Sequence, residues 1–294
     1  MNRFKYSAEN APKAWFFLIP ALAIIIIFNV VPLIRTFYMS FYRGSLTNPQ
    51  FNDIQNYITV LTDTKFHTAI KNTSIYAFVV VPVALALSLL IAITIHEKIK
   101  YKDFFETIFF IPYLTSMIAV GVVFRFLLNG DYGIVNFVLG LIGIGPIDFL
   151  NNPSMAITTI IIFGVWSGLA FNIIILLSGI KSINTDYYKV ADMFGATKVE
   201  QFRKITLPQL IPIITFLLTV NFISSFKVYT QVFAIFNGKA GIADSATTAV
   251  FYIYNKFYVQ NRYGEGMAAA LILFVLILLF TMVQRMIMKK VAQR

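Results

Sequence analysis

The sequence predicts an all-α integral membrane protein with six transmembrane helices, and two observations carry the prediction. The first is composition: hydrophobic residues make up 58% of the chain and charged residues 13%, where soluble domains have roughly 25% charged residues. Mean hydropathy is +0.75. The second is that the apolar residues form separate runs, each close to the roughly 20 residues that a helix needs to cross a bilayer.

The six apolar runs are expected to span the membrane at residues 14–33, 73–95, 108–128, 156–180, 210–236 and 266–283. The first run is expected to be retained, because no small-x-small cleavage site follows it. The loop 129–152 is rich in Gly and Asn and is expected to contain a short, half-buried helix. The predicted organisation is therefore an N-terminal segment 1–13, a six-helix membrane domain 14–288 and a tail 289–294.

Six spans place both termini on one side of the membrane, and the basic residues indicate which side. They concentrate in the head, in the loop 96–107, in the polar segment 183–208 and in the tail. Basic loops stay in the cytoplasm, so we expect both termini and the polar segment to be cytoplasmic. The net charge of +11 is explained by these loops. No base-stacking platform accompanies the basic residues, so nucleic acid is not an expected partner.

The polar segment 183–208 has helical periodicity. Its first half has an apolar stripe at i, i+3, i+4 and i+7, which predicts a helix, formed by Tyr187, Val190, Ala191 and Phe194. Asn184 or Thr185 can cap the start of this helix, and Gly195 can end it in the left-handed conformation. A second short helix is expected to end at Pro208 and to turn three side chains inward: Val199, Phe202 and Ile205. Two short helices joined at a glycine indicate a docking element, and we call residues 183–208 the docking segment.

The chain shows no energy source of its own. Ion-coupled transporters usually carry an intramembrane carboxylate, and none of the 13 acidic residues lies at the centre of a span. Sodium sites built from carbonyls and hydroxyls remain an alternative. No P-loop of the form G-x-x-x-x-G-K-[ST] is present. A transporter of this sequence would need an external ATPase.

Catalytic and metal chemistry is not expected either. Cysteine is absent, and the two histidines, His67 and His96, lie in different loops, so the sequence predicts no metal site and no cofactor. Serines occur in the spans without a histidine or carboxylate beside them, which argues against an intramembrane enzyme. A channel would show charged rings or a selectivity filter. Flux without ATP would favour that alternative.

The docking segment also contains the pattern A-x-x-x-G-A-x-x-x-x-x-F-x-x-I-x-L-P, from Ala191 to Pro208. This spacing resembles the cytoplasmic EAA loop of permease subunits in binding-protein-dependent ABC importers, whose first helix is a coupling helix that sits in a cleft of the partner ATPase. Three positions depart from the family: Lys189-Val190-Ala191 stands in place of Glu-Ala-Ala, which changes the first two residues, and Phe194 replaces Asp. We therefore carry over the docking role without the ion pair of the family's glutamate. The residues implied in coupling are Tyr187, Tyr188, Lys189, Val190, Ala191, Phe194, Gly195 and Ala196.

The resemblance covers essentially the whole chain and points to the permease type of maltose and glycerol-3-phosphate importers. One stretch departs, with Lys239-Ala240-Gly241 in place of Gly-Gly-Pro. The similar stretches include Ala14 to Pro20, Asn56-Tyr57, Asn72-Thr73, Phe110-Ile111-Pro112, Ile223 to Tyr229 and Thr247-Thr248. The resemblance implies the type I ABC importer permease fold, in a multi-pass protein of the bacterial cytoplasmic membrane.

It also implies partners and a substrate. The partners would be a second homologous permease, two ATP-binding subunits and an extracellular solute-binding protein. ATP hydrolysis would reside in those subunits, so this chain is not expected to be an enzyme. The substrate would be a carbohydrate, either a monosaccharide or an oligosaccharide, with glycerol-3-phosphate or another polar solute as the alternative.

The family's substrate contacts lie on the fourth and fifth spans. They map here onto Gly164, Gly168, Phe171, Asn172, Asn221, Ser224 and Ser225. An aromatic face can stack on sugar C–H groups, and amides and hydroxyls can meet ring hydroxyls. The first three residues share one helix face, so we expect Phe171 to face the path and Asn172 to flank it. The alternative is that small and polar residues here only mediate helix packing.

Overall fold

The computed structural model describes residues 11–98 and 102–292. The first ten residues of the predicted head and the last two of the tail therefore lie outside the described residues. Within the described part, five helices are long and apolar enough to cross a membrane: Trp15–Met39, Thr64–His96, Ala156–Lys181, Lys198–Phe226 and Tyr263–Lys290. The chain divides into two compact units. Unit 1 comprises the chain up to Thr62 and Ile253–Ile272, and unit 2 comprises Asp63–Tyr252 and Leu273–Arg294.

Unit 1 begins with one continuous helical rod, made of α1 (Ala11–Ile25), a π turn (Ile26–Val30) and α2 (Val31–Met39). The wide turn comes directly before Pro32. There the N–H of Val31 donates to the carbonyl of Ile26, five residues back. A proline has no N–H to donate and its ring crowds the preceding turn, so a wider turn accommodates it.

A β-hairpin follows, which the sequence did not predict. Strands β1 (Tyr42–Gly44) and β2 (Pro49–Phe51) pair antiparallel, and α3 (Gln55–Thr62) comes next. Asn56 on α3 is buried, and its amide donates to the carbonyls of Ser40 (2.8 Å) and Tyr42 (2.9 Å). This bonding explains why an asparagine suits the start of α3.

The remainder of unit 1 comes from near the C-terminal end of the chain. It contains a π turn (Asn255–Val259) and the start of α14 (Tyr263–Ala292). Lys256 is paired with Glu265 at 2.8 Å, and their side chains are only 8% and 15% exposed. Arg262 reaches the other carboxylate oxygen at 3.3 Å. A buried lysine requires such a partner, so this ion pair joins the turn to the helix.

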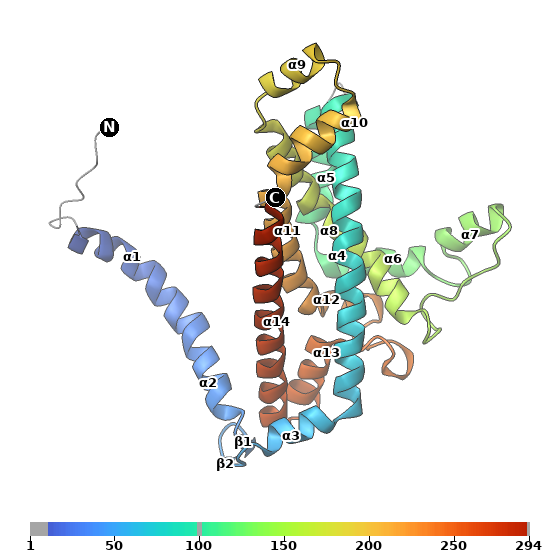
Figure 1. The fold of residues 1–294 in the computed structure, drawn as a ribbon. Coiled ribbons are helices and arrows are strands. Elements are labelled where there is room, and N and C mark those ends of the chain that lie inside the picture. The colour runs from blue at the N-terminus through green and yellow to red at the C-terminus, as the bar shows by residue number, and fades with distance from the viewer. Residues whose placement is uncertain (1–10, 99–101, 293–294) are drawn as a thin grey trace. The chain divides into compact units, whose positions relative to one another are not determined.

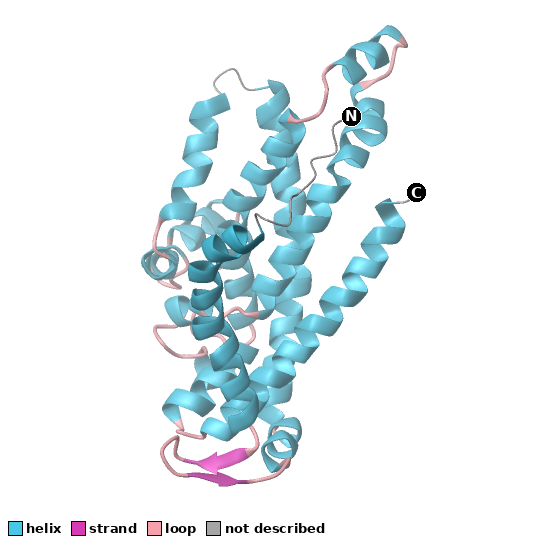
Figure 2. Cartoon of the chain, turned by 90° about the vertical axis from the view of Figure 1, so that its left-hand side faces the viewer, coloured by secondary structure: helices cyan, strands magenta, loops and turns pink. Residues whose placement is uncertain are grey.

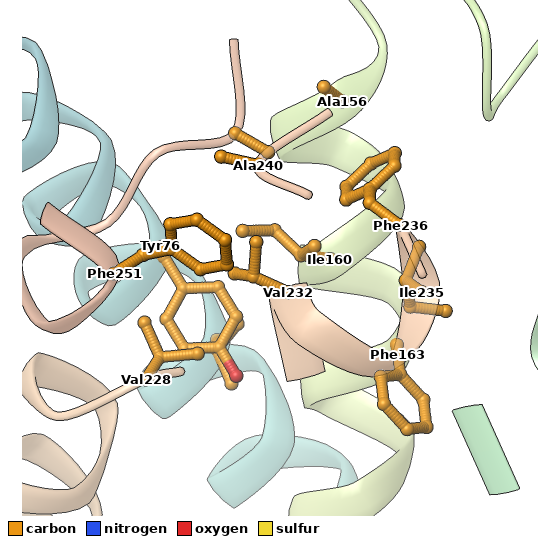
Figure 3. Close-up of a cluster of buried hydrophobic side chains, with 12 residues drawn as sticks. Tyr76, Ala156, Ile160, Phe163, Val228, Val232, Ile235, Phe236, Ala240 and Phe251 are labelled. Atoms are coloured by element: carbon orange, nitrogen blue, oxygen red, sulfur yellow. The ribbon is translucent and has the colours of Figure 1, made fainter. Parts of the chain in front are cut away.

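In unit 2, α4 (Thr64–Lys98) packs along α8 (Ala156–Lys181) and α11 (Leu207–Phe226). Figure 1 shows these helices running side by side. Figure 3 shows the buried cluster that joins α4 to α8 and α12 (Thr230–Ile235), with Tyr76, Ile160 and Phe163 among its members. α8 matches the predicted fourth span to within one residue.

The predicted third span, residues 108–128, is not one helix. It is divided into α5 (Lys102–Leu114) and α6 (Met117–Leu127), with Ser116 in an extended conformation at φ −62° and ψ 122°. The break lets α6 pack closely on α12. There a side chain at Gly121 would overlap the Cβ of Ala234. Both halves are apolar, so hydropathy does not reveal the break.

The docking segment and the fifth span also differ from the prediction. α9 (Asp186–Met193) is followed by α10 (Lys198–Gln201), a π turn (Phe202–Thr206) and then α11 without interruption. The second short helix therefore does not end at Pro208. That proline comes just after the π turn, where the N–H of Leu207 donates to the carbonyl of Phe202 five residues back, and this wider turn accommodates the proline ring inside the continuous helix. The fifth span ends at Phe226 rather than at residue 236, because α12 is a separate helix.

Three short helices complete unit 2: α7 (Ile134–Leu141), a 3-10 turn (Ile242–Asp244) and α13 (Ala249–Tyr254). α7 was expected to be half-buried, yet it contains no buried residue. The segment before α13 is fastened to α4. Asn72 donates to the carbonyls of Ser245 and Thr247, both at 3.0 Å, and Thr73 accepts from the N–H of Ala249 at 2.8 Å.

Candidate functional site

The first candidate site is the docking segment. It lies at one end of unit 2, beyond the ends of α4 and α8 (Figure 1). Its helix α9 is capped by Asn184, whose side-chain oxygen accepts from the N–H of Asp186 at 2.9 Å. Thr185 makes no such bond. Of the two predicted caps, the asparagine is therefore the one used.

Gly195 ends α9 in the predicted conformation, with φ +71°. Its N–H donates to the carbonyl of Asp192 at 3.0 Å, and the N–H of Ala196 donates to Ala191 at 3.0 Å. These two bonds make the glycine-terminated helix end known as the Schellman motif. A Cβ on Gly195 would meet nothing within 4 Å. Glycine is thus favoured here by backbone conformation alone.

The turn after Gly195 is fixed by polar side chains. Thr197 and Glu200 form a reciprocal capping box at the start of α10. Gln201 was not predicted as a site residue, yet it is buried. Its amide donates to the carboxylate of Asp192 at 2.6 Å and to the carbonyl of Ala196 at 3.1 Å. The two helices of the docking segment are therefore held in one geometry.

The exposed face of the docking segment is apolar. Phe194 and Met193 are 87% and 86% exposed, and Tyr187 and Val190 are exposed beside them. Met193 was not predicted, because it falls outside the i, i+3, i+4 pattern. Tyr188 instead turns inward, and its hydroxyl hydrogen-bonds that of Thr206 at 2.8 Å.

Several charges on the docking segment are paired within it, including Lys198 with Asp192 and Lys204 with Glu200, both at 3.8 Å. Lys189 pairs with Asp186 at 2.9 Å on its own helix, and both side chains are exposed. Such pairs contribute little stability. A cavity of about 370 Å³ lies behind the segment, lined in part by Tyr188, Gln201 and His96.

The second candidate site is a cavity of about 350 Å³ in unit 2. It contains all seven residues predicted from the fourth and fifth spans. Its lining is contributed by α4, α5, α6, α8, α11 and α12: Tyr76, Val80, Val81, Ala84, Tyr113, Met117, Gly164, Ser167, Gly168, Phe171, Asn172, Val220, Asn221, Ser224, Ser225 and Gln231.

Two asparagines join the helices that carry the predicted residues. The Asn221 amide on α11 donates to the Asn172 side-chain oxygen on α8 at 2.8 Å. Asn172 is only 1% exposed, and its own amide nitrogen has no hydrogen-bond partner among the described residues. Asn172 is therefore more than the flanking residue that was expected. The cavity is lined by both Phe171 and Asn172, which are adjacent in the chain, so it borders two faces of α8.

Aromatic side chains form another wall. Phe171 on α8 stacks on Tyr113 of α5, with ring centroids 5.9 Å apart and an interplanar angle of 22°. Phe171 is half-buried, whereas Tyr113 is exposed. A flat aromatic surface of this kind suits the C–H face of a sugar ring.

Of the two glycines of α8 that were predicted as contact residues, Gly164 serves helix packing. A Cβ at Gly164 would overlap the ring and hydroxyl of Tyr76 on α4, and one at Gly168 would contact Ala84 at 3.5 Å. Gly164 therefore admits the Tyr76 ring rather than a ligand. Tyr76, Tyr113, Met117 and Gln231 were not predicted as lining residues. Tyr76 shares one face of α4 with Val80 and Ala84. This spacing predicts that the face is buried, but it does not show that the face borders the cavity.

Comparisons with known proteins agree with this architecture. Residues 75–293 match the family model described as a binding-protein-dependent transport system inner membrane component. The chain is 29% identical to the trehalose/maltose transport system permease protein of Thermococcus litoralis, covering 96% of this chain and 95% of that one. It is 30% identical to the lactose transport system permease protein of Rhizobium radiobacter, covering 91% and 92%.

Solved structures share the fold. A chain of a bacterial ABC transporter that imports the acidic polysaccharide alginate is 24% identical, with a TM-score of 0.79 over 98% of this chain and 99% of that one. A second structure of such a transporter, with a periplasmic protein bound to an alginate pentasaccharide, has a TM-score of 0.82 over 99% of both chains. The chain therefore belongs to the family of inner membrane components of binding-protein-dependent transport systems.

Proposed function

We propose that this chain is the permease subunit of an ABC importer and forms the translocation path for a carbohydrate. The observation that carries this proposal is the cavity of about 350 Å³, which is lined both by the stacked Phe171 and Tyr113 rings and by the Asn172–Asn221 amide pair. Its volume falls within the ligand-pocket range of about 300–1,000 Å³. The relatives named as trehalose/maltose and lactose permeases support the same substrate class.

The cavity favours a neutral sugar over a phosphorylated solute. No lysine or arginine is among its lining residues. A phosphate group would call for such a cation, because charge-assisted bonds are the strong contacts to phosphate. Glycerol-3-phosphate is therefore the less favoured alternative. The buried Asn172 amide nitrogen supplies a donor for a sugar hydroxyl once the two asparagines separate.

We further propose that the docking segment couples the chain to a partner ATPase. The exposed stripe of Tyr187, Val190 and Phe194, extended by Met193, supports this role. Half-buried Tyr188 with Ala191, Gly195 and Ala196 would hold that stripe in place. Lys189 is paired with Asp186 on its own helix, so the proposed contact is mainly apolar.

The assembly and orientation complete the proposal. The permease domain over residues 14–288 would associate with a second homologous permease, two ATP-binding subunits and an extracellular sugar-binding protein. The N-terminal segment 1–13, the docking segment and the tail 289–294 would face the cytoplasm, as the distribution of basic residues predicts.

Uptake into proteoliposomes that contain the full assembly tests this function. We expect accumulation of a labelled neutral sugar that requires both ATP and the binding protein. Equal flux without ATP would instead identify a channel. ATP-driven uptake of glycerol-3-phosphate alone would contradict the choice of a neutral sugar.

A further inference from the structure

Arg125 lies in the last turn of α6 and is not used by the transport site. Its guanidinium donates to the side-chain oxygen of Asn237 at 3.3 Å. The ion pairs found in the described part of the chain do not include it. An arginine at the end of an apolar helix in a membrane protein reaches for water or for an anion. The hydrogen bond to Asn237 uses only part of the five N–H donors of the Arg125 guanidinium, so further N–H groups can bind an anion.

The guanidinium borders a cavity of about 230 Å³ that combines polar and apolar walls: Val122, Arg125, Phe126, Asn129, Tyr132 and Leu150. No carboxylate is among these residues. Asp148, the acidic residue that follows α7, is engaged by the N–H of Asn151 at 2.9 Å. Asp131 lies between the lining residues Asn129 and Tyr132 in the chain but is not itself part of the lining, so the lining carries the single positive charge of Arg125 and suits a small anionic group.

The neighbouring helix α7 is apolar and exposed. No charged residue occurs from Tyr132 to Ile147, and Ile134, Phe137 and Leu141 are all more than half exposed. Figure 1 shows α7 projecting from the side of unit 2, crosswise to α4, and Figure 2 views it nearly end-on. An apolar helix crosswise to the spans is typical of a segment lying in the membrane interface.

The loop that carries α7 is firmly built. The Asn136 amide donates to the carbonyls of Gly130 (3.1 Å) and Ile147 (2.9 Å), and its oxygen accepts from the N–H of Ile147 at 3.0 Å. One side chain therefore closes both ends of the loop. α7 is held next to the Arg125 cavity, so a cationic side chain and an apolar surface meet at one place.

We propose that Arg125 and α7 form a binding site for an anionic phospholipid. The lipid phosphate accepts from the guanidinium, which is shaped for bidentate contact with phosphate. The Asn129 amide and the Tyr132 hydroxyl can reach the remaining headgroup oxygens, and the acyl chains lie along Ile134, Phe137 and Leu141. A protein partner that packs on α7 would not need the Arg125 cation, because α7 itself carries no charge. A phospholipid contacts both features, the cation through its phosphate and the apolar helix through its acyl chains.

Lipid preference of the purified chain tests this proposal. Native mass spectrometry and thermal unfolding in detergent would compare phosphatidylglycerol with phosphatidylcholine. We expect wild-type protein to retain and be stabilised by the anionic lipid. Arg125→Gln should lower the preference about tenfold, the factor expected for losing one hydrogen bond to a charged group. Arg125→Lys should keep most of it. Arg43→Gln, on the exposed strand β1, removes the same charge elsewhere and should change nothing.

Three further measurements test the proposal. Tyr132→Phe removes a hydroxyl while keeping the ring, so the preference should fall without a change of stability in phosphatidylcholine. Inorganic phosphate at matched concentration should not stabilise the protein. Unchanged preference in Arg125→Gln and Tyr132→Phe, or equal stabilisation by phosphate alone, overturns the proposal. A spin label attached to Phe137→Cys in the assembled transporter gives the third test. If the label is shielded from oxygen dissolved in the membrane, a protein covers α7 and the proposal is overturned.

Discussion

Replacing Gly195 tests whether the end of α9 positions the docking surface. Its φ of +71° lies in the left-handed region, where a residue with a Cβ is less stable by about 1–2 kcal/mol. No atom lies within 4 Å of a Cβ built there, so Gly195→Ala carries this backbone cost alone. Gly195→Asn should cost less, because asparagine tolerates this conformation. Gly195→Pro should cost most, because φ is fixed near −65° and the bond to Asp192 is lost.

A cost of about 1–2 kcal/mol corresponds to a factor of about 5–30 in an equilibrium constant. We therefore expect the affinity for the partner ATPase to fall in the order Gly, Asn, Ala, Pro, with Ala weaker by about 5–30-fold. Titration of the solubilised membrane subunits with labelled ATPase measures this affinity, and sugar uptake measures coupling. The proline variant should insert into the membrane normally but fail to couple ATP hydrolysis to uptake. Wild-type affinity of the Gly195→Ala variant for the ATPase, or normal sugar uptake by the Gly195→Pro variant, would refute the reasoning.

Three further predictions follow from the same structure. Phe171→Ala should lower sugar uptake at least about tenfold while binding-protein-stimulated ATP hydrolysis persists, because stacking on Tyr113 and the sugar is lost; equal loss of both activities would indicate a packing residue. Asn172→Ala should instead destabilise the protein by about 1–3 kcal/mol in thermal unfolding, because it leaves the Asn221 donor unmatched; unchanged stability would mean that the pair contributes nothing. A cysteine at Met193 should be labelled only from the cytoplasm and one at Asn151 only from outside, and the reverse pattern would invert the topology. Met193 is suitable for labelling because its side chain is 86% exposed.

The buried ion pair of unit 1 offers a stability test with its own control. Glu265→Gln removes the carboxylate that Lys256 contacts at 2.8 Å, so we expect a loss of about 3–5 kcal/mol. Arg262→Gln removes the more exposed partner and should cost less than about 1 kcal/mol. Similar losses in both variants, measured by thermal unfolding, would show that burial of Lys256 does not determine the cost.

Features that depend on one segment were predictable from the sequence. The i, i+3, i+4 stripe and Gly195 predicted α9 and its left-handed end, because local periodicity and glycine conformation need no partner. The bounds of α8 followed from the length of an apolar run. The resemblance to the permease family placed the predicted contact residues on two helices, and in the structure these residues line one cavity.

Features that depend on packing between segments were not predictable. The break at Ser116 serves the approach of Gly121 to Ala234, and no hydropathy window contains that contact. Tyr76 and Gln201 looked like ordinary residues of a span and a polar loop, because their roles come from α8 and α9. Helical spacing predicted that Asn172 flanks the translocation path. It could not show that Asn221 on α11 hydrogen-bonds the Asn172 side chain.

The continuity of α10, the π turn and α11 has a mechanical consequence. The helix Lys198–Phe226 contains 29 residues, and at 1.5 Å per residue its start lies about 35 Å from Asn221. A tilt of about 5° about its docking end would displace the Asn221 backbone by about 3 Å on this rise per residue. That movement exceeds what the 2.8 Å bond to Asn172 can absorb. The helix would thus act as a lever, by which a small rotation at its docking end can break the hydrogen bond between Asn221 and Asn172 that borders the cavity.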